Sequence, residues 1–245
     1  MSRTLFALLL LTTAFFVSHT YANEGGEPLA AQKWSFTGLN GKYDKDEIYR
    51  GYTVATQVCL ACHSFKYISH RDLMRVGFTE SEVLTLAKAL NMTLDQKIIS
   101  GQDDATAMET FGKVPPDLSL MVKAREGLAD YVYGVLTGYS EDPAVIRHYL
   151  PGGLPAGGHF NKVFPGHSIA MPSPLSADDL VTFHDGTKAT VPQMAHDVVT
   201  FLQWAAEPER IERQHLGLFV LMYLVIFCIL AYLSKRVIWK DVKGH

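Results

Sequence analysis

The chain has 245 residues, with 22 basic and 25 acidic side chains, so its formal net charge is −3. This slight acidic excess argues against nucleic acid as a partner, because nucleic-acid binding relies on a basic surface. A long uncharged run lies near each end of the sequence, and the two runs indicate export and attachment to a membrane.

Residues 1–22 have the pattern of a secretory signal peptide. Arg3 supplies the positive charge, residues 5–17 are mainly apolar, and the small-residue exit Thr20-Tyr21-Ala22 precedes a polar segment. We predict cleavage after Ala22, because the apolar run is short for a membrane span; the alternative is a retained anchor helix. Cleavage leaves 21 basic and 25 acidic side chains, a net charge of −4, on the exported chain.

The pentapeptide Cys59-Leu60-Ala61-Cys62-His63 is typical of covalent c-type haem attachment. Residues three and four apart on a helical turn share one face, so both thiols can reach one porphyrin and His63 can ligate its iron. The alternatives are a thioredoxin-like thiol pair and half of a zinc site. A zinc site needs a second cysteine pair, and a thioredoxin motif follows a strand, whereas residues 49–58 have a helical pattern. We therefore predict one covalently bound haem c.

Helices are predicted around this motif. One helix covers residues 44–61 and leads into the haem motif, and another begins after the capping box Thr79-Glu80-Ser81-Glu82 and ends near residue 90. Asp117 follows two prolines and is predicted to cap a helix that runs to about residue 126. Residues 128–137 are predicted to continue in helical structure.

Residues 139–176 contain six prolines and five glycines. We predict a long loop without regular structure, and loops of this length in compact domains are usually functional. The loop contains candidates for the second axial ligand of the iron: Met171, where nearby prolines restrict the backbone, and His159 and His167. An open sixth position is the remaining alternative.

A small β element and one more helix are predicted before the membrane segment. Asp185-Gly186 lies between β-forming residues of segment 181–190, which is a hairpin signal. A second capping box, Thr190 with Gln193, precedes an amphipathic helix over residues 194–206. The predicted fold is mainly α, a haem domain with a long Pro/Gly-rich loop and a small β-hairpin, followed by one C-terminal transmembrane helix.

Residues 216–233 (LGLFVLMYLVIFCILAYL) carry no charge and make about 27 Å of helix, enough to cross a bilayer. Four basic residues follow them (Lys235, Arg236, Lys240 and Lys243), which predicts a cytoplasmic C-terminus and a periplasmic haem domain at a bacterial inner membrane. The predicted divisions are a haem domain over 23–208, a transmembrane helix over 209–237 and a tail over 238–245. Haem attachment would take up Cys59 and Cys62, and the third cysteine, Cys228, lies within the span, so no disulfide is predicted in the mature haem domain.

Taken with these features, the whole chain resembles the cytochrome c1 family, the membrane-anchored haem subunits of cytochrome bc1 complexes. The resemblance covers nearly all of the mature chain. The matching segments are RGY at 50–52, VCLACHS at 58–64, PPDLS at 115–119, KAR at 123–125, DYV at 130–132, LTGY at 136–139, FPG at 164–166 with Met171, FHDGT at 183–187, and residues 199–209.

The resemblance implies roles for individual residues. In the family, the methionine of the F-P-G loop is the sixth iron ligand, which corresponds here to Met171. An arginine after P-P-D-L-S contacts a haem propionate, which corresponds to Arg125, and a guanidinium fork suits a carboxylate. Pro116 and Tyr131 are implied to line the haem pocket. The sequence by itself predicts only a solvated cation, a helix-start proline and a core tyrosine at these positions.

The resemblance also implies an electron relay that is not catalytic as an isolated chain. Such a subunit of quinol–cytochrome c reductase (respiratory complex III) accepts electrons from an iron–sulfur (Rieske) protein and passes them to a soluble or membrane-bound c-type cytochrome. Cytochrome b and a dimeric complex are the implied surroundings. The alternatives are a membrane-tethered haem domain of a peroxidase or dehydrogenase, and a haem-binding sensor or assembly factor. The first would need an open iron position or a second cofactor motif, and the sequence has neither a second C-x-x-C-H nor a G-x-G-x-x-G.

Overall fold

The computed structural model describes residues 28–38 and 41–240, so the predicted signal peptide lies outside the described residues. The chain divides into two compact units. Among the described residues, unit 1 comprises 28–32 and 124–174, and unit 2 comprises 33–38, 41–123 and 175–240. The C-x-x-C-H motif therefore belongs to unit 2, and the Pro/Gly-rich segment with Met171 belongs to unit 1.

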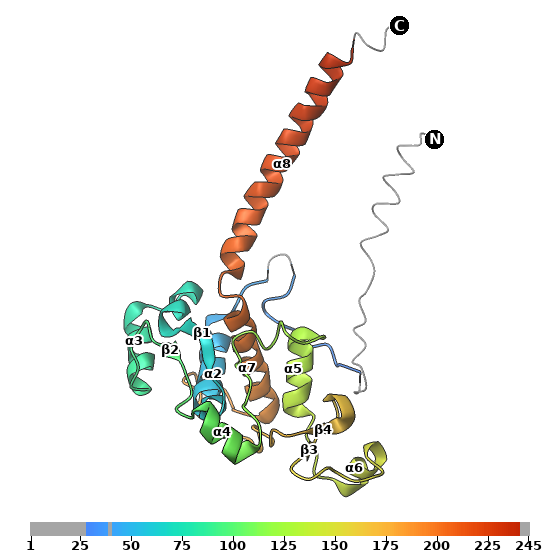
Figure 1. The fold of residues 1–245 in the computed structure, drawn as a ribbon. Helices are drawn as coiled ribbons and strands as arrows, with labels where there is room; N and C mark the ends of the chain where they lie inside the picture. Colours follow the sequence, from blue (N-terminus) through green and yellow to red (C-terminus); the bar gives the residue numbers. More distant parts are fainter. Residues whose placement is uncertain (1–27, 39–40, 241–245) are drawn as a thin grey trace. The chain divides into compact units, whose positions relative to one another are not determined.

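Most regular structure in the described residues is helical, which confirms the mainly α class (Figure 1). Unit 2 contains α2 (Lys45–Gln57), the 3-10 turn η2 (Cys59–Ala61), β1 (Phe65–Ser69), η3 (His70–Val76), α3 (Glu80–Ala89), β2 (Lys97–Ile98), α4 (Asp104–Phe111), α7 (Val191–Ala206) and α8 (Arg210–Ile238). Unit 1 contains α5 (Leu128–Thr137), α6 (Pro143–Tyr149), β3 (His159–Phe160), η4 (Pro165–His167) and β4 (Ser168–Ile169). The strands form two antiparallel pairs, β1 with β2 and β3 with β4.

The core of unit 2 forms where α2 packs against α7 (Figure 1). The two helices approach so closely at Gly51 that a Cβ there would lie 2.1 Å from the Asp197 carbonyl oxygen. Next to this crossing, Arg50 donates through Nε to the fully buried Asp197 carboxylate at 2.8 Å and through a second nitrogen to Asp185 at 2.6 Å. Phe201 and Trp204 of α7 are also fully buried. This contact orients the helix that leads directly into the haem motif.

The helix starts predicted at residue 44 and at the Thr79 capping box are confirmed. The Asp44 side chain accepts from the backbone N–H groups of residues 46 and 47, and the Thr79 capping box forms in both directions with Glu82. α2 ends at Gln57, so the predicted helix over 44–61 is wrong in its last turn, which is the separate 3-10 turn η2. Thr190 caps α7 by accepting from the Gln193 N–H. The Gln193 side chain does not complete the predicted capping box, because it donates to Asp197 instead.

The helix predicted from Asp117 to about residue 126 is wrong; this segment forms a series of turns before α5. The Asp117 carboxylate accepts from the Ser119 N–H at 2.9 Å and also from the Lys66 N–H of β1 at 2.8 Å. The Ser119 hydroxyl accepts from the Tyr67 N–H, and the Leu118 N–H donates to the Ser64 carbonyl. These bonds hold the segment against the region around β1. Because its polar groups are paired there, the segment does not form a helix.

Segment 139–176 is more regular than predicted. Pro143 occupies the first turn of α6, where it needs no hydrogen-bond partner, and Asp142 caps that helix by accepting from the Ala144 N–H at 2.8 Å. β3 and β4 pair with His159 opposite Ile169. The small hairpin is therefore present here rather than at 181–190.

The hairpin predicted over 181–190 forms its turn but not its strands. The Gly186 N–H donates to the Phe183 carbonyl, as a turn requires. The Asp185 carboxylate, however, accepts from the Thr187 N–H and from Arg50 of α2. With Val181 and Phe183 buried, the segment is held by α2 and not by a partner strand.

α8 matches the transmembrane helix predicted over 209–237 to within one residue at each end, and it is apolar and long enough to cross a membrane. Charged residues join its start to the rest of unit 2: Arg75 of η3 donates to Glu212 at 2.8 Å, and Glu207 accepts from Lys123 and Arg213, each at 2.7 Å. Burial by itself would raise the pKa of Glu207, but the bonds from Lys123 and Arg213 outweigh it and hold that pKa below its ordinary value.

Candidate functional site

The C-x-x-C-H motif forms a tight turn directly after α2. The carbonyl oxygen of Cys59 accepts from the N–H groups of both Cys62 and His63, at 3.1 and 2.9 Å. Neither cysteine is in a disulfide, and both side chains are partly exposed. The turn thus presents two free thiols and an imidazole from five consecutive residues, as covalent haem attachment requires.

His63 is held in the orientation of a metal ligand. Its Nδ1 lies 2.7 Å from the carbonyl oxygen of Pro116. A carbonyl can only accept, so Nδ1 carries the proton and Nε2 keeps its lone pair. Burial lowers the pKa of His63 below its ordinary value, which favours the neutral ring. Metal-ligating histidines characteristically donate their second ring N–H to such a group, which sets the tautomer and the ring plane.

Residues from two other segments of unit 2 support the turn. The Ser64 hydroxyl accepts from the Ser100 N–H at 3.0 Å, and the Ser64 carbonyl accepts from the Leu118 N–H at 2.9 Å. Leu118 lies two residues after Pro116, so the same connection brings the Pro116 carbonyl to the His63 ring. Pro116, predicted by resemblance to line the pocket, acts here through its carbonyl on the histidine.

The chemistry of these side chains fits a haem better than the two alternatives for the motif. Burial raises the pKa of the Cys59 thiol to about 12, with Cys62 adding to the effect, whereas redox-active C-x-x-C pairs depend on a lowered thiol pKa. Among residues 28–38 and 41–240, no group of three or more His, Cys, Asp and Glu side chains could hold a metal ion. A zinc site therefore finds no further ligands in the part of the chain that the structure describes.

In unit 1, Met171 lies just beyond β4 and is partly exposed. The Tyr139 hydroxyl donates to its backbone carbonyl at 3.0 Å. The loop before it is anchored by Asn161, whose fully buried side chain donates to the Val135 carbonyl of α5 at 2.7 Å. Met171 is therefore held through its backbone.

The two histidines that compete with Met171 have different surroundings. His159 is exposed on β3. The Nδ1 of His167 lies 3.0 Å from the Lys162 carbonyl oxygen, and its ring packs against Tyr149 and Phe160. A carbonyl partner requires donation, so His167 also keeps a free Nε2, but its ring is part of the aromatic packing of the β3–β4 hairpin.

Arg125 lies in the turn before α5, and Tyr131 lies in the first turn of that helix. Arg125 is exposed and donates to the neighbouring Ala124 carbonyl. The ion pairs found among the described residues do not include it. Burial raises the pKa of Tyr131, and nearby Arg125 opposes that rise. The guanidinium is thus available to an external carboxylate such as a propionate.

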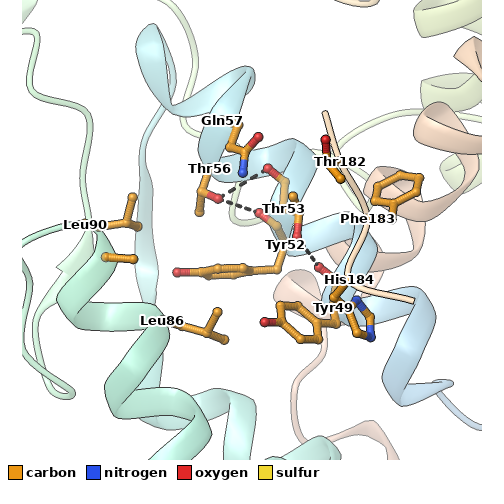
Figure 2. Close-up of a pocket in the computed structure, with 11 residues that line it drawn as sticks. Tyr49, Tyr52, Thr53, Thr56, Gln57, Leu86, Leu90, Thr182, Phe183 and His184 are labelled. Atoms are coloured by element: carbon orange, nitrogen blue, oxygen red, sulfur yellow. Dashed lines mark hydrogen bonds between the residues drawn. The ribbon is translucent and has the colours of Figure 1, made fainter. Parts of the chain in front are cut away.

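A groove of about 410 Å³ lies on the α2 surface of unit 2 (Figure 2). Tyr49, Tyr52 and Leu86 line it, and His184 stacks on Tyr49 with ring centroids 4.0 Å apart. The hydroxyls of Thr53 and Thr56 bond back to carbonyls of their own helix. No predicted site residue lines this groove, and we assign it no role.

The loop that carries Met171 in unit 1 is supported by two residues that the sequence did not identify as functional. Asn161 and Tyr139 both lie in the segment expected to lack regular structure. A polar amide between the apolar Phe160 and Val163 is the only local signal of Asn161, and Tyr139 is marked only by its place in LTGY. Neither signal shows which backbone group the side chain binds.

Comparison with known proteins gives consistent matches over most of the chain. The family model described as Cytochrome C1 family matches residues 34–242. The chain is 39% identical over 255 residues to the protein named cytochrome c1 from Rhodospirillum rubrum, with 91% of each covered. It is 38% identical over 244 residues to the mitochondrial cytochrome c1 heme protein of Kluyveromyces lactis, covering 91% of this chain and 80% of that one. It is 37% identical to cytochrome b/c1 of Bradyrhizobium diazoefficiens, covering 90% of this chain and 37% of that one.

Proposed function

The chain belongs to the cytochrome c1 family, and from this premise we propose that it is the haem electron-transfer subunit of a bacterial quinol–cytochrome c reductase. In the proposed path, the chain accepts an electron from the iron–sulfur protein and passes it to a c-type cytochrome. The isolated chain makes and breaks no substrate bond. The haem c supplies a one-electron couple when it is bound.

The observation that carries the proposal is the bond between His63 Nδ1 and the Pro116 carbonyl at 2.7 Å. It leaves Nε2 as the free donor of a neutral imidazole next to two thiols, which is the donor set of a covalently attached haem. We propose thioether bonds from Cys59 and Cys62, His63 as one axial ligand and Met171 as the other.

Electrostatics gives the proposed roles of the remaining site residues. The exposed Arg125 guanidinium would bind a propionate as a two-pronged donor, and the nearby Tyr131 would border the same pocket. A thioether donor favours ferrous iron, so Met171 would raise the potential relative to a nitrogen or oxygen ligand. A filled sixth position would also exclude small molecules from the iron, as a relay requires.

The membrane helix supports the proposed location and partners. α8 is apolar and long enough to cross the inner membrane, and the cations that follow it favour a cytoplasmic C-terminus. The relative named cytochrome b/c1 is much longer than the part this chain matches, and its name supports cytochrome b as a partner. We propose that the complex is dimeric. The haem domain would then face the periplasm, where the Rieske protein and a soluble or membrane-bound c-type cytochrome can reach it.

An optical spectrum of the reduced, full-length protein tests the proposal. We expect a c-type spectrum that carbon monoxide leaves unchanged, because both axial positions are filled. In Met171→Leu we expect covalent haem to remain, carbon monoxide to bind and the midpoint potential to fall. A wild-type protein that binds carbon monoxide readily would contradict the relay and favour an enzyme with an open iron position.

A further inference from the structure

Asn161 anchors the loop that carries Met171 to helix α5. Its Nδ2 donates to the Val135 carbonyl at 2.7 Å, and its Oδ1 accepts from the N–H groups of Val163 and Phe164 at 3.0 and 3.1 Å. The side chain is fully buried, so breaking any of these bonds would leave a polar group unsatisfied. The loop therefore starts from a fixed point on α5.

Tyr139 is positioned from the same point. Its backbone forms an antiparallel bridge with Asn161, and the Lys162 N–H donates to the Gly138 carbonyl at 2.9 Å. A Cβ on Gly138 would lie 2.7 Å from the Gly134 carbonyl oxygen and 3.0 Å from Asn161 Oδ1. Glycine at this position keeps the end of α5 against Asn161, and this contact places the Tyr139 backbone.

Met171 lies two residues beyond β4, where the strand pairing has ended. Pro172 and Pro174 have no N–H group, so this segment has few backbone donors of its own. The Tyr139 hydroxyl donates to the Met171 carbonyl at 3.0 Å. A carbonyl oxygen can only accept, so the Tyr139 hydroxyl is the donor in this bond.

We infer that Tyr139 is a positioning residue that holds the backbone of Met171 so that its sulfur stays within reach of the iron. The inference rests on the proposed function, in which Met171 is the sixth ligand. A thioether is a weak ligand whose occupancy depends on how firmly its backbone is held. Removing one hydrogen bond to a neutral acceptor should therefore shift the equilibrium between bound and released sulfur by about fivefold.

The experiment compares Tyr139→Phe with Tyr43→Phe in the full-length, haem-loaded protein purified in detergent. Tyr43 is a matched control, because its hydroxyl also donates to one backbone carbonyl, that of Gln203 at 3.3 Å, but within unit 2. Ferric protein is titrated with imidazole, which binds the iron when the sulfur leaves. The far-red charge-transfer band of sulfur-ligated ferric haem and the midpoint potential are recorded in parallel.

In Tyr139→Phe we expect the apparent imidazole affinity to rise about fivefold, with a weaker far-red band and a lower potential. Tyr43→Phe should change none of these, although its unfolding midpoint should fall. An equal rise in both variants would show general loosening and overturn the inference.

Met171→Leu separates failure of the inference from failure of the proposed function. If the far-red band is lost in Met171→Leu but imidazole affinity is unchanged in Tyr139→Phe, the ligand stands and the positioning role is wrong. If Met171→Leu keeps the wild-type band and potential, Met171 is not the ligand, and the proposed ligand set and the inference both fail.

Discussion

Gly51→Ala tests the close contact between α2 and α7 that orients the haem motif. The new Cβ would lie 2.1 Å from the Asp197 carbonyl oxygen and 2.7 Å from the Phe201 Cβ. Both atoms belong to the body of α7 and cannot rotate away, so the two helices must separate. Overpacking of this kind costs about 1–3 kcal/mol, and the rigid neighbours place Gly51 near the upper limit.

Part of that cost is offset, since alanine favours helix over glycine by about 1 kcal/mol. We therefore expect a net loss of about 2 kcal/mol, which lowers the urea midpoint by about 1 M for a slope near 2 kcal/mol per molar. The assay is urea unfolding of the full-length protein in detergent, followed by tryptophan fluorescence and haem absorbance. Trp204 is fully buried in α7 and reports on this interface directly.

Gly101→Ala is the control, because a Cβ on Gly101 would enter open space, with no atom within 4 Å apart from its chain neighbours. It should change the unfolding free energy by less than about 0.5 kcal/mol. A wild-type midpoint in Gly51→Ala would refute the reasoning, because it would mean that the helices are not in backbone contact at this residue.

Three further perturbations have defined outcomes. Arg50→Met should lower the unfolding free energy by about 3–5 kcal/mol in urea unfolding, because it leaves the buried Asp197 carboxylate without its cation, whereas Arg71→Met, in an exposed ion pair, should change it little. Glu207 has a lowered pKa, so its contribution to stability is present above pH 4.5 and is lost as the pH falls through its folded-state pKa. Glu207→Gln should therefore flatten the acid side of a curve of unfolding free energy against pH, and an unchanged curve would contradict this. Ending the chain after Pro208 should give a soluble haem protein with the wild-type spectrum that no longer co-purifies with cytochrome b; loss of the haem spectrum would show that α8 is needed for folding.

Local signals predicted the elements that depend on neighbours in sequence. Thr79 and Glu82 satisfy each other's backbone groups within one helical turn, so the pattern of residue types was sufficient to place the start of α3. The spacing of Cys59, Cys62 and His63 is likewise contained in one turn. The uncharged run within α8 is apolar whatever surrounds it, so the sequence was sufficient to predict a helix that could cross a membrane. In these cases the interactions that decide the structure lie within a few residues.

Tertiary structure decided the features that depend on distant segments. Asp117 has the residue type of a helix cap, but its bond to Lys66, 51 residues away, places it beside β1 and no helix follows. The tautomer of His63 depends on Pro116, 53 residues away, and the backbone of Met171 is held by Tyr139, 32 residues away. Residue types alone cannot specify such bonds, because each requires two segments to be brought together by the packing of the helices that precede and follow them. The sequence by itself determined which residues could bind a haem, and the folded chain decided which backbone groups hold them in place.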